Sequence, residues 1–383
     1  MTDDDSTKGL PLTGIRVLEL GSSVAAPYGA WIMGALGAEV IKVERPGPGD
    51  DARHWGPPFA HGTSTLFHTY NREKRSLVVD LKDAAEVEKL QTFIVENIDA
   101  VIQNLRPGVA DRLGLGADKL LALSPRLVYC NIWAFGASGP MQSRPGYDPL
   151  MQAFGGIMSV NGAKGSTPAR VGTSIVDKGT GMWCAIGILS MLQKRQHSGR
   201  GGIVDTSLLE TALAWMSFHV TDFFATGVAP EAHGSGIRGI APYQAYRCSD
   251  GYLVVAAAND RLFSKLAETL GHPEWLKDER FENNPARSRN LSALNAQLDP
   301  EFARATRAEW EMRLGKAGIP CAPMQTLDEV VVHPQVQSLG IVQTSEPHEI
   351  PMVGPPVKFD GERPPLRREA PELGEYNETF SKS

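Results

Sequence analysis

A single acidic residue, Asp177, lies in the stretch VGTSIVDKGTGMW. The preceding run VGTSIV is β-like and apolar, and the following KGTG is small enough to let a ligand approach the backbone. We expect a long helix to begin near Asp177, because a long apolar segment follows. The positive end of its dipole would keep the carboxylate ionised, and an ionised carboxylate at a cleft can act as a nucleophile. The alternative is a simple helix N-cap, a position that aspartate favours.

The elements that would position this acid form an alternating pattern. Five strand-like runs are separated by helical or turn-rich segments: GIRVLELG from Gly14, EVIKVERP from Glu39, SLVVDL from Ser76, DAVIQNL from Asp99 and RLVYCNIWAFG from Arg126. Alternation of this kind predicts an α/β fold with a parallel sheet, here a Rossmann-like large domain. After the long helix, the run DTSLLETALAWMSFHVTDFFATG predicts a second helical stretch that ends at Gly227.

The length of 383 residues favours two domains. A glycine-rich stretch without periodicity, VAPEAHGSGIRGI, separates the helical run from a hairpin-like YQAYRCSDGYLVVAAA and from helices that extend to about Lys316. We therefore predict that residues 1–227 form the first part of the large domain and that residues 228–325 form a smaller α+β domain. Residues 326–383 are predicted to return to the large domain.

Basic residues gather where the predicted strands end, which is where open α/β sheets bind ligands. Glu44 could serve as the ribose acid of a dinucleotide site, but the turn GSSVAAP lacks the G-x-G-x-x-G pattern, and Arg45 follows directly. Arginine holds phosphates by paired hydrogen bonds. The group favours a phosphate-rich ligand over NAD, although any one member could be a surface charge: Lys42, Arg45, Arg53, Lys74, Arg75, Arg106 and Arg112.

The composition excludes several classes of function. A net charge of −6 argues against a nucleic-acid or anionic-membrane partner. The four cysteines are far apart and there is no HExxH, so neither disulfides nor a metal site is expected, and reduced thiols favour a cytoplasmic protein. The acidic start MTDDDSTKG is unlike a signal peptide, and the apolar run Met182 to Leu192 is short for a membrane span.

Several ordered motifs together resemble the class III CoA-transferases, the family of formyl-CoA transferase and crotonobetainyl-CoA:carnitine CoA-transferase. The resemblance covers about Pro11 to Glu378 and is specific because so many motifs occur in order. They are LTGIRVLELG, MGALGAEVIKVERPGPGD, NREKRSLVVDL, ENIDAVIQNLRPGVADRLGL, RPGYDPLMQAFGGIMSVNG, VGTSIVDKGTGMWCAIGIL, GRGGIVDTSLLE and GIPCAPMQTLDEVVVHPQV.

The resemblance implies an enzyme that moves CoA from an acyl-CoA donor to a carboxylic acid. Asp177 matches the family's nucleophile, which passes through an aspartyl acyl anhydride and an aspartyl-CoA thioester. The thioester energy is preserved, so the resemblance implies no ATP, metal or permanently bound cofactor; the CoA thioester is the substrate.

By similarity, Arg45 and Arg112 would contact the phosphates or adenine of CoA, with Asn104, Arg106 and Lys42 nearby. Ser23, Val24 and Ala25 would line the pantetheine or acyl pocket and could offer backbone N–H groups to an oxyanion. Tyr147 would lie beside the thioester. Gly234, Ser235 and Gly236 match a mobile loop that covers the intermediate. The family's interlocked homodimer is implied here as well.

The substrates and two alternatives stay open. Ser22, Ser23 and Val24 replace the glutamine or histidine of some family members, so their substrates do not carry over. Arg72 or Arg238 could bind a second carboxylate, which favours succinyl-CoA with a small di- or hydroxy-acid. One alternative is an α-methylacyl-CoA racemase, disfavoured because Gly-Tyr-Asp stands where its Gly-His-Asp would be and tyrosine is a poor base. The other is a non-catalytic CoA-binding paralogue.

Overall fold

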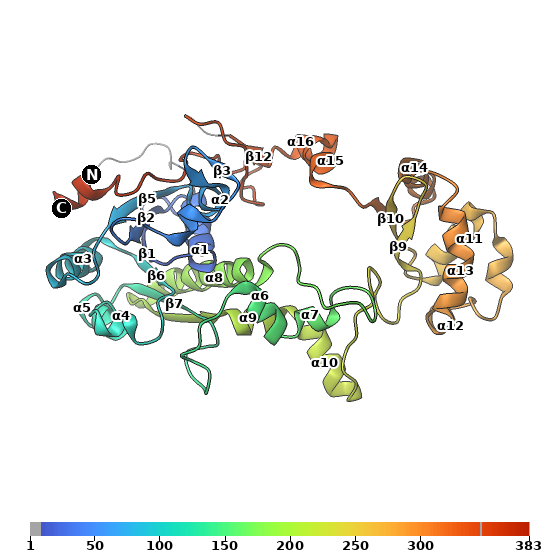
Figure 1. Cartoon of the computed structure of the whole chain (residues 1–383), viewed down its shortest axis with the longest axis horizontal. Coiled ribbons are helices and arrows are strands. Elements are labelled where there is room, and N and C mark those ends of the chain that lie inside the picture. Colours follow the sequence, from blue (N-terminus) through green and yellow to red (C-terminus); the bar gives the residue numbers. More distant parts are fainter. Residues whose placement is uncertain (1–8, 345–346, 383) are drawn as a thin grey trace. The chain divides into compact units, whose positions relative to one another are not determined.

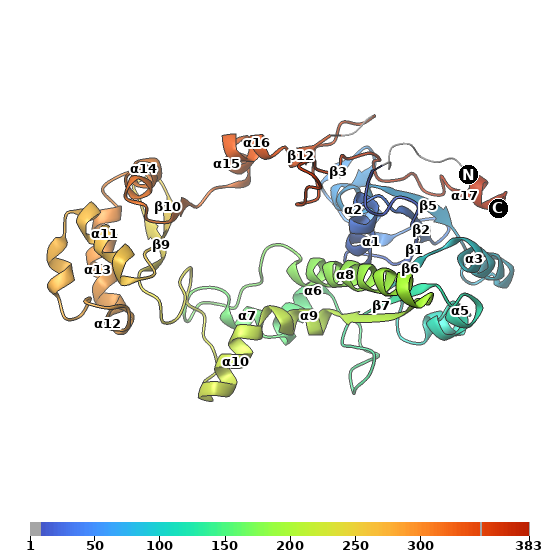
Figure 2. The same ribbon diagram turned by 180° about the vertical axis from the view of Figure 1, so that it is seen from behind.

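The chain is described here by a computed structural model that covers residues 9–344 and 347–382 (Figures 1 and 2). It forms two compact units. Among the described residues, the first contains residues 9–157, 171–221, 335–344 and 347–382, and the second contains residues 158–170 and 222–334. The main part of the second unit thus begins at residue 222 and ends at residue 334, whereas the sequence predicts 228 and 325. The second unit also includes residues 158–170, which the sequence assigns to the large domain.

The first unit is built on a six-stranded sheet whose order is β5-β2-β1-β6-β7-β8. Every neighbouring pair is parallel, which confirms the expected α/β architecture. The strands are β1 (Arg16–Leu20), β2 (Glu39–Glu44), β5 (Lys74–Val78), β6 (Ala100–Gln103), β7 (Val128–Trp133) and β8 (Gly202–Ser207). Five of them lie within the predicted runs or overlap them, so the β-branched segments were a reliable guide.

Helices cover both faces of this sheet (Figures 1 and 2). On one face, α1 (Ala25–Ala35) packs against α8 (Ile175–Ser198). On the other, α3 (Ala84–Asn97), α5 (Ala117–Leu123) and α17 (Asn377–Ser381) contribute to an apolar core. That core joins strand residues such as Leu18 and Val101 to Phe93 of α3 and Phe380 of α17. Burial of apolar side chains on both faces is what a parallel sheet requires.

Shorter elements complete the first unit. The connection after β2 contains a 3-10 turn (Asp51–His54), β3 (Phe59–Ala60), β4 (Thr63–Ser64) and α2 (Thr65–Asn71). The remaining elements are α4 (Val109–Arg112), α6 (Asp148–Phe154), α7 (Ile157–Val160), α9 (Leu208–Trp215), α10 (Ser217–Thr226), α16 (Pro334–Leu339), β12 (Val342–Gln343) and β13 (Met352–Val353), of which α7, α10 and α16 cross a unit boundary.

The sequence pattern suggested that the run beginning at Asp205 is helical throughout, and this is wrong. Its first residues belong to the edge strand β8, and α9 starts at Leu208. The Ser207 side chain accepts a hydrogen bond from the N–H of Glu210 and so caps α9. Gly201 is needed before the strand, because a Cβ there would lie 1.9 Å from the carbonyl oxygen of Leu127. Because Ser207 is both the last residue of β8 and the N-cap of α9, its capping pattern was taken as part of the helix and the preceding strand was not predicted.

Helix α8 is the long helix expected after Asp177, and it ends at Gly199 in the left-handed conformation with φ of 68°. By length and composition alone it could cross a membrane. Its buried side chains, among them Val176, Cys184 and Ile188, instead pack inside the first unit, as those of a core helix do.

The second unit is α+β. A three-stranded antiparallel sheet has the order β11-β10-β9, with β9 (Tyr243–Arg247), β10 (Tyr252–Ala256) and β11 (Cys321–Pro323). The β9–β10 hairpin confirms the predicted one. The helices are α11 (Asp260–Leu270), α12 (Asn284–Arg289), α13 (Leu291–Phe302), α14 (Arg307–Ala317) and α15 (Leu327–Val332), with a 3-10 turn at Pro273–Lys277. Together they enclose a separate apolar core around Tyr246, Phe263 and Phe302.

Candidate active site

Asp177 lies in the first turn of α8 and is neither preceded by a strand nor placed at the N-cap. The helix begins at Ile175, and Ser174 is the N-cap but makes no side-chain capping bond. Neither the expected strand nor the alternative of an Asp177 N-cap is found. A carboxylate from another helix, that of Asp148 in α6, accepts hydrogen bonds from the N–H groups of Val176 (2.8 Å) and Asp177 (3.2 Å). The cap therefore comes from Asp148, and the Asp177 side chain is released for other chemistry.

Asp148 is the functional residue that the sequence reasoning missed, since it entered only through the comparison with racemases. Its side chain is buried and also accepts a hydrogen bond from Gln152 Nε2 at 2.5 Å. Gln152 Oε1 accepts from the N–H of Val171 at 2.8 Å. These contacts fix the segment that enters α8. The Asp-Pro pair that opens α6 was the available local signal, because proline favours the first helical turn.

The Asp177 carboxyl is electrostatically unusual. Burial and the nearby negative charge of Asp148 raise its pKa to about 7. Desolvation and the second carboxylate therefore oppose the effect of the helix dipole, which was expected to keep the group ionised. In the part of the chain that the structure describes, the carboxylate forms no ion pair. An anionic Asp177 is thus poorly solvated and has no ion-pair partner among the described residues, which favours nucleophilic attack.

The small residues after Asp177 serve helix packing. A Cβ on Gly179 would lie 2.8 Å from Thr211 Cγ2 of α9, and one on Gly181 would lie 2.7 Å from the Ala25 carbonyl oxygen of α1. We expected these glycines to let a ligand approach the backbone, but α9 and α1 fill the space beside them. Gly181 is one turn beyond Asp177 on the same helix face, so the start of α1 lies close to the acid.

The turn between β1 and α1 is held by two polar side chains, those of Asn104 and Asp50. Asn104 Oδ1 accepts from the N–H of Ser22 at 3.1 Å, and Asn104 Nδ2 donates to its carbonyl at 2.9 Å. Asp50 Oδ1 accepts from the N–H of Ser23 at 3.3 Å, and Ser23 has φ of 72°. That N–H group was expected to serve an oxyanion; it is already engaged by Asp50. Asn104, predicted near CoA, positions this turn.

Lys42 lies beneath the turn in a cluster of buried charges. Its Nζ lies 3.0 Å from Glu19 Oε1 and 2.8 Å from Asp50 Oδ2, and it donates to the Gly21 carbonyl at 2.8 Å. Burial lowers the pKa of Lys42, but the surrounding carboxylates together raise it above its usual value. Its side chain is fully buried, so the structure does not bring Lys42 to a surface where CoA phosphates could meet it. Lys42 supports the turn from below.

Three predicted CoA contacts remain exposed near the carboxyl ends of the strands: Arg45, Arg106 and Arg112. Arg45 follows β2 and Arg106 follows β6, the two strands that flank β1, so both leave the same edge of the sheet. Arg45 pairs with the exposed Asp51. Arg112 ends α4.

The other basic candidates are engaged within the fold. Arg53 is buried and binds Glu44 through two hydrogen bonds, at 2.8 Å and 2.7 Å. Lys74 Nζ lies 2.7 Å from Glu19 Oε2, and Arg75 Nε lies 3.2 Å from Glu39. Glu44, once considered as a ribose acid, is therefore occupied by Arg53.

The remaining predicted site residues divide between the units. Val24 and Ala25 are buried at the start of α1, and Tyr147 is exposed immediately before Asp148, both in the first unit. Gly234, Ser235 and Gly236 belong to the second. There Gly234 has φ of 63° and donates to the Gly162 carbonyl, and Ser235 Oγ accepts from the N–H of Ala245.

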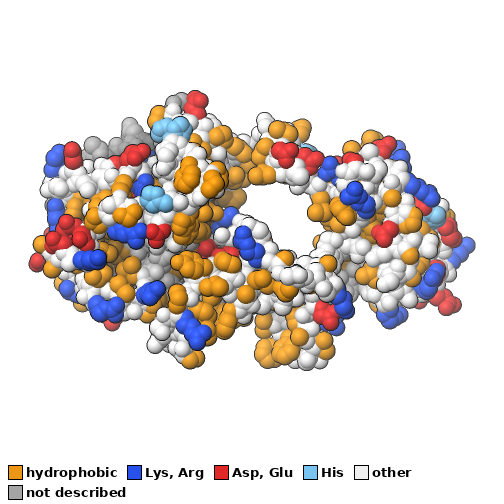
Figure 3. Space-filling model, viewed as in Figure 1, with side chains coloured by type: hydrophobic (Ala, Val, Ile, Leu, Met, Phe, Trp, Pro, Cys, Tyr) orange, Lys and Arg blue, Asp and Glu red, His pale blue; other side chains and the backbone are white. Residues whose placement is uncertain are grey.

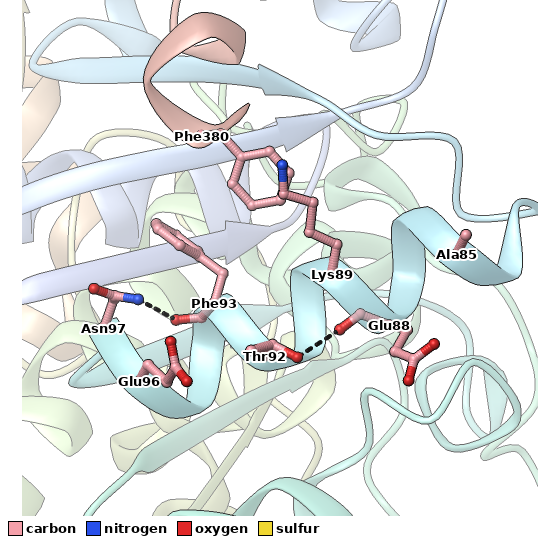
Figure 4. Close-up of a pocket in the computed structure, with 8 residues that line it drawn as sticks. All are labelled: Ala85, Glu88, Lys89, Thr92, Phe93, Glu96, Asn97 and Phe380. Atoms are coloured by element: carbon pink, nitrogen blue, oxygen red, sulfur yellow. Dashed lines mark hydrogen bonds between the residues drawn. The ribbon is translucent and has the colours of Figure 1, made fainter. Parts of the chain in front are cut away.

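A surface pocket of about 360 Å³ lies elsewhere, between α3 and α17 (Figure 4). Lys89 covers the ring of Phe380 at 4.5 Å, and the rings of Phe93 and Phe380 meet edge to face. Phe93 and Phe380 belong to the core on the sheet face opposite α1 and α8. The pocket is thus separated from Asp177 by the sheet. No cluster of three or more metal-ligating side chains occurs among residues 9–344 and 347–382.

With this geometry established, the sequence comparisons identify the class of protein. The chain belongs to CoA-transferase family III, whose profile matches residues 12–377. It is 34% identical to succinyl-CoA:glutarate CoA-transferase of Mus musculus over 98% of this chain and 86% of that protein. It is 35% identical to acetyl-CoA:oxalate CoA-transferase of Acetobacter aceti, covering 97% of this chain and 95% of that one.

A solved structure agrees with this assignment. The crystal structure of a CAIB/BAIF family protein from Brucella suis matches with a TM-score of 0.87 and 36% identity, over 97% of this chain and 99% of that one. The chain is a CoA-transferase, and CoA thioesters and carboxylic acids are consistent as its substrates. The racemase and the non-catalytic paralogue are thereby disfavoured.

Because Asp148 lies close to Asp177, we predict how kcat/KM depends on pH. If Asp177 must be ionised to react, kcat/KM should rise with pH and level off above about pH 7. Asp148→Asn removes a negative charge but keeps an acceptor oxygen, so the pKa of Asp177 should fall and the acid limb should move down by about one pH unit. A pH–rate profile measures this, with the exposed Asp118→Asn as control. An unmoved limb in Asp148→Asn would show that another group titrates.

Proposed function

We propose that the protein transfers CoA between short dicarboxylic acids by covalent catalysis at Asp177. The observation that carries the proposal is the half-buried, unpaired carboxylate in the first turn of α8, beside a second carboxylate that holds the helix start. The substrate class is supported by relatives whose names include succinyl-CoA with glutarate, D-citramalate or L-malate, and acetyl-CoA with oxalate.

The proposed reaction begins when the Asp177 carboxylate attacks the thioester carbonyl of the donor and expels CoA thiolate, which leaves a mixed anhydride. The thiolate then attacks the Asp177 carbonyl of that anhydride and releases the donor acid as a carboxylate. Asp177 now carries CoA as a thioester. Each step replaces one activated acyl bond by another, so no external energy source is consumed.

The second half repeats these steps in reverse order. The acceptor carboxylate attacks the Asp177 thioester and expels CoA thiolate, forming a new anhydride. The thiolate attacks the acceptor carbonyl, which frees Asp177 and gives the acceptor's CoA thioester. Arg45, Arg106 and Arg112 are proposed to hold the CoA phosphates, since they are the exposed cations at the strand ends. Loop residues 234–236 are proposed to exclude water from the anhydride.

The direct test is mass-spectrometric detection of new CoA thioesters when the enzyme meets succinyl-CoA and a panel of carboxylic acids. We expect new thioesters of dicarboxylic acids. Turnover of only carnitine-type monocarboxylates or long-chain acyl groups would refute the substrate class, while leaving family membership untouched.

An interlocked homodimer is also proposed. Large apolar side chains are exposed on α8, α9 and the edge strand β8, namely Met182, Trp183, Ile186, Ile203, Leu213 and Trp215. On the face drawn in Figure 3, further hydrophobic side chains lie over α10. Exposed apolar patches of this kind mark association surfaces. Sedimentation analysis should give the mass of two chains, and Trp183→Arg should weaken the dimer; a monomeric wild type would refute this. The cytoplasmic location stays a prediction.

A further inference from the structure

A dicarboxylic substrate presents a second carboxylate that needs a partner near Asp177, and the two arginines predicted for it are already engaged. Arg72 is only 3% exposed; its guanidinium donates to the carbonyls of Thr69 and Val353 and lies 4.3 Å from the Trp31 ring centre. Arg238 pairs with Asp222 at 3.1 Å in the second unit. Arg72 is therefore a structural residue, and Arg238 already has a carboxylate partner.

Lys178 is the cation that directly follows the nucleophile. Its Nζ donates to Thr173 Oγ1 at 2.9 Å and lies 5.9 Å from the centre of the Tyr70 ring. Within the described residues Lys178 forms no ion pair, with Asp177 or with any other acid. An ammonium group has three donors, so hydrogen-bonding capacity remains after the bond to Thr173. The side chain is half-buried, which strengthens its attraction for an anion.

Tyr70 connects the two charged groups. The negative charges of Asp177 and Asp148 act on its phenol, while its ring is within cation–π reach of Lys178. The ring also meets Tyr28 edge to face at 5.8 Å, and Tyr28 packs beside Gly181 of α8. Asp177 and Lys178 thus carry opposite charges at consecutive positions of α8, both act on Tyr70, and they form no ion pair with each other within the described residues.

We propose that Lys178, held by Thr173 and Tyr70, binds the distal carboxylate of the acyl group while the reacting carboxyl carbon meets Asp177. This inference rests on the proposed function and extends it, because it assigns the choice of dicarboxylic over monocarboxylic acids to one side chain. Without Lys178 the distal carboxylate of a dicarboxylic acid would lose this cation while the negative charges of Asp148 and Asp177 remained, which would disfavour binding.

The test compares glutarate with pentanoate, an acid of equal chain length that lacks the second carboxylate, using succinyl-CoA as donor. In Lys178→Met the ratio of kcat/KM for glutarate to that for pentanoate should fall about 10- to 100-fold, which is what one charge-assisted hydrogen bond supplies. The loss should lie mainly in KM for glutarate. Lys178→Arg should restore much of the ratio. Lys194→Met, the same change at an exposed site of α8, is the matched control.

Two results would overturn the inference. An unchanged ratio in Lys178→Met would show that another group reads the distal carboxylate. Equal losses for both acids would show that Lys178 acts on Asp177 or on the helix start and not on the substrate. A wild-type enzyme that transfers CoA to neither glutarate nor any other acid would instead overturn the proposed function, and this inference with it. The wild-type assay therefore separates the two failures.

Discussion

Asp177→Asn should lower kcat for CoA transfer by at least about 10³-fold, because the amide cannot form the anhydride or the thioester on which the proposed route depends. Asparagine is nearly isosteric, so the backbone contacts of Asp148 to residues 176 and 177 should persist. Steady-state assays by thioester mass spectrometry measure the loss. Binding of CoA, which we propose to involve the exposed arginines, should be retained, and an equilibrium binding assay would show this.

The same variant should be more stable than the wild type at alkaline pH. The native pKa of Asp177 is about 7, above the usual value for aspartate, so native protein keeps a proton that the unfolded chain releases from about pH 4 upward. Wild-type stability should therefore fall as pH rises towards 7. At about pH 8 the variant should gain roughly 1–2 kcal/mol, after allowance for solvent screening at a partly exposed group. If the difference in the free energy of unfolding between the variant and the wild type were the same at about pH 4 and about pH 8, the argument that burial raises the pKa of Asp177 would be contradicted.

Lys42→Met should have the largest effect on folding. It removes the cation shared by Glu19 and Asp50. Glu19 keeps its ion pair with Lys74, but the buried carboxylate of Asp50 is left without a cation, at a cost of about 3–5 kcal/mol in the free energy of unfolding. Activity should fall too, because the Gly21 carbonyl and the turn before α1 lose a contact from Lys42 Nζ. Denaturant unfolding measures the stability change.

A matched substitution separates burial from charge. Lys82→Met makes the same change at an exposed position before α3 and should alter stability by less than about 0.5 kcal/mol. The double variant Asp50→Asn with Lys42→Met should recover part of the loss, since the stranded charge of Asp50 is removed while Glu19 keeps its pair with Lys74. A Lys42→Met protein as stable as the wild type would mean that water reaches the cluster and that the charges are not buried as described.

The sequence predicted the elements better than the contacts between them. Strands β1, β2, β6 and β7 are short β-branched runs that end at turn residues, so local patterns were sufficient. Strand β8 was missed because its last residue also caps α9, and the capping pattern resembled the start of a helix. The parallel sheet followed from alternation, since parallel strands need a crossover between them.

The site required information that no local pattern contains. Asp177 was singled out by its local pattern and then by the family resemblance, but its raised pKa depends on burial and on Asp148, which is 29 residues earlier in the chain and adjacent only in the fold. The basic residues near the strand ends looked alike in sequence. Burial separates them: Lys42 and Arg53 point inward to acids, and Arg45 is exposed. Lys42 lies on β2, Arg45 lies beyond its end and Arg53 lies in the following 3-10 turn, so the local sequence pattern does not separate their roles.

The most direct measurement locates CoA on the enzyme. The protein is incubated with succinyl-CoA alone, the mixture is reduced with borohydride, and tryptic peptides are analysed by mass spectrometry. Cleavage after Arg170 and Lys178 gives VGTSIVDK, in which Asp177 is the sole side-chain carboxylate. We predict that this peptide acquires the mass of the reduced alcohol, and that Asp177→Asn does not. An unmodified peptide from an enzyme that turns over in parallel would contradict covalent catalysis at Asp177.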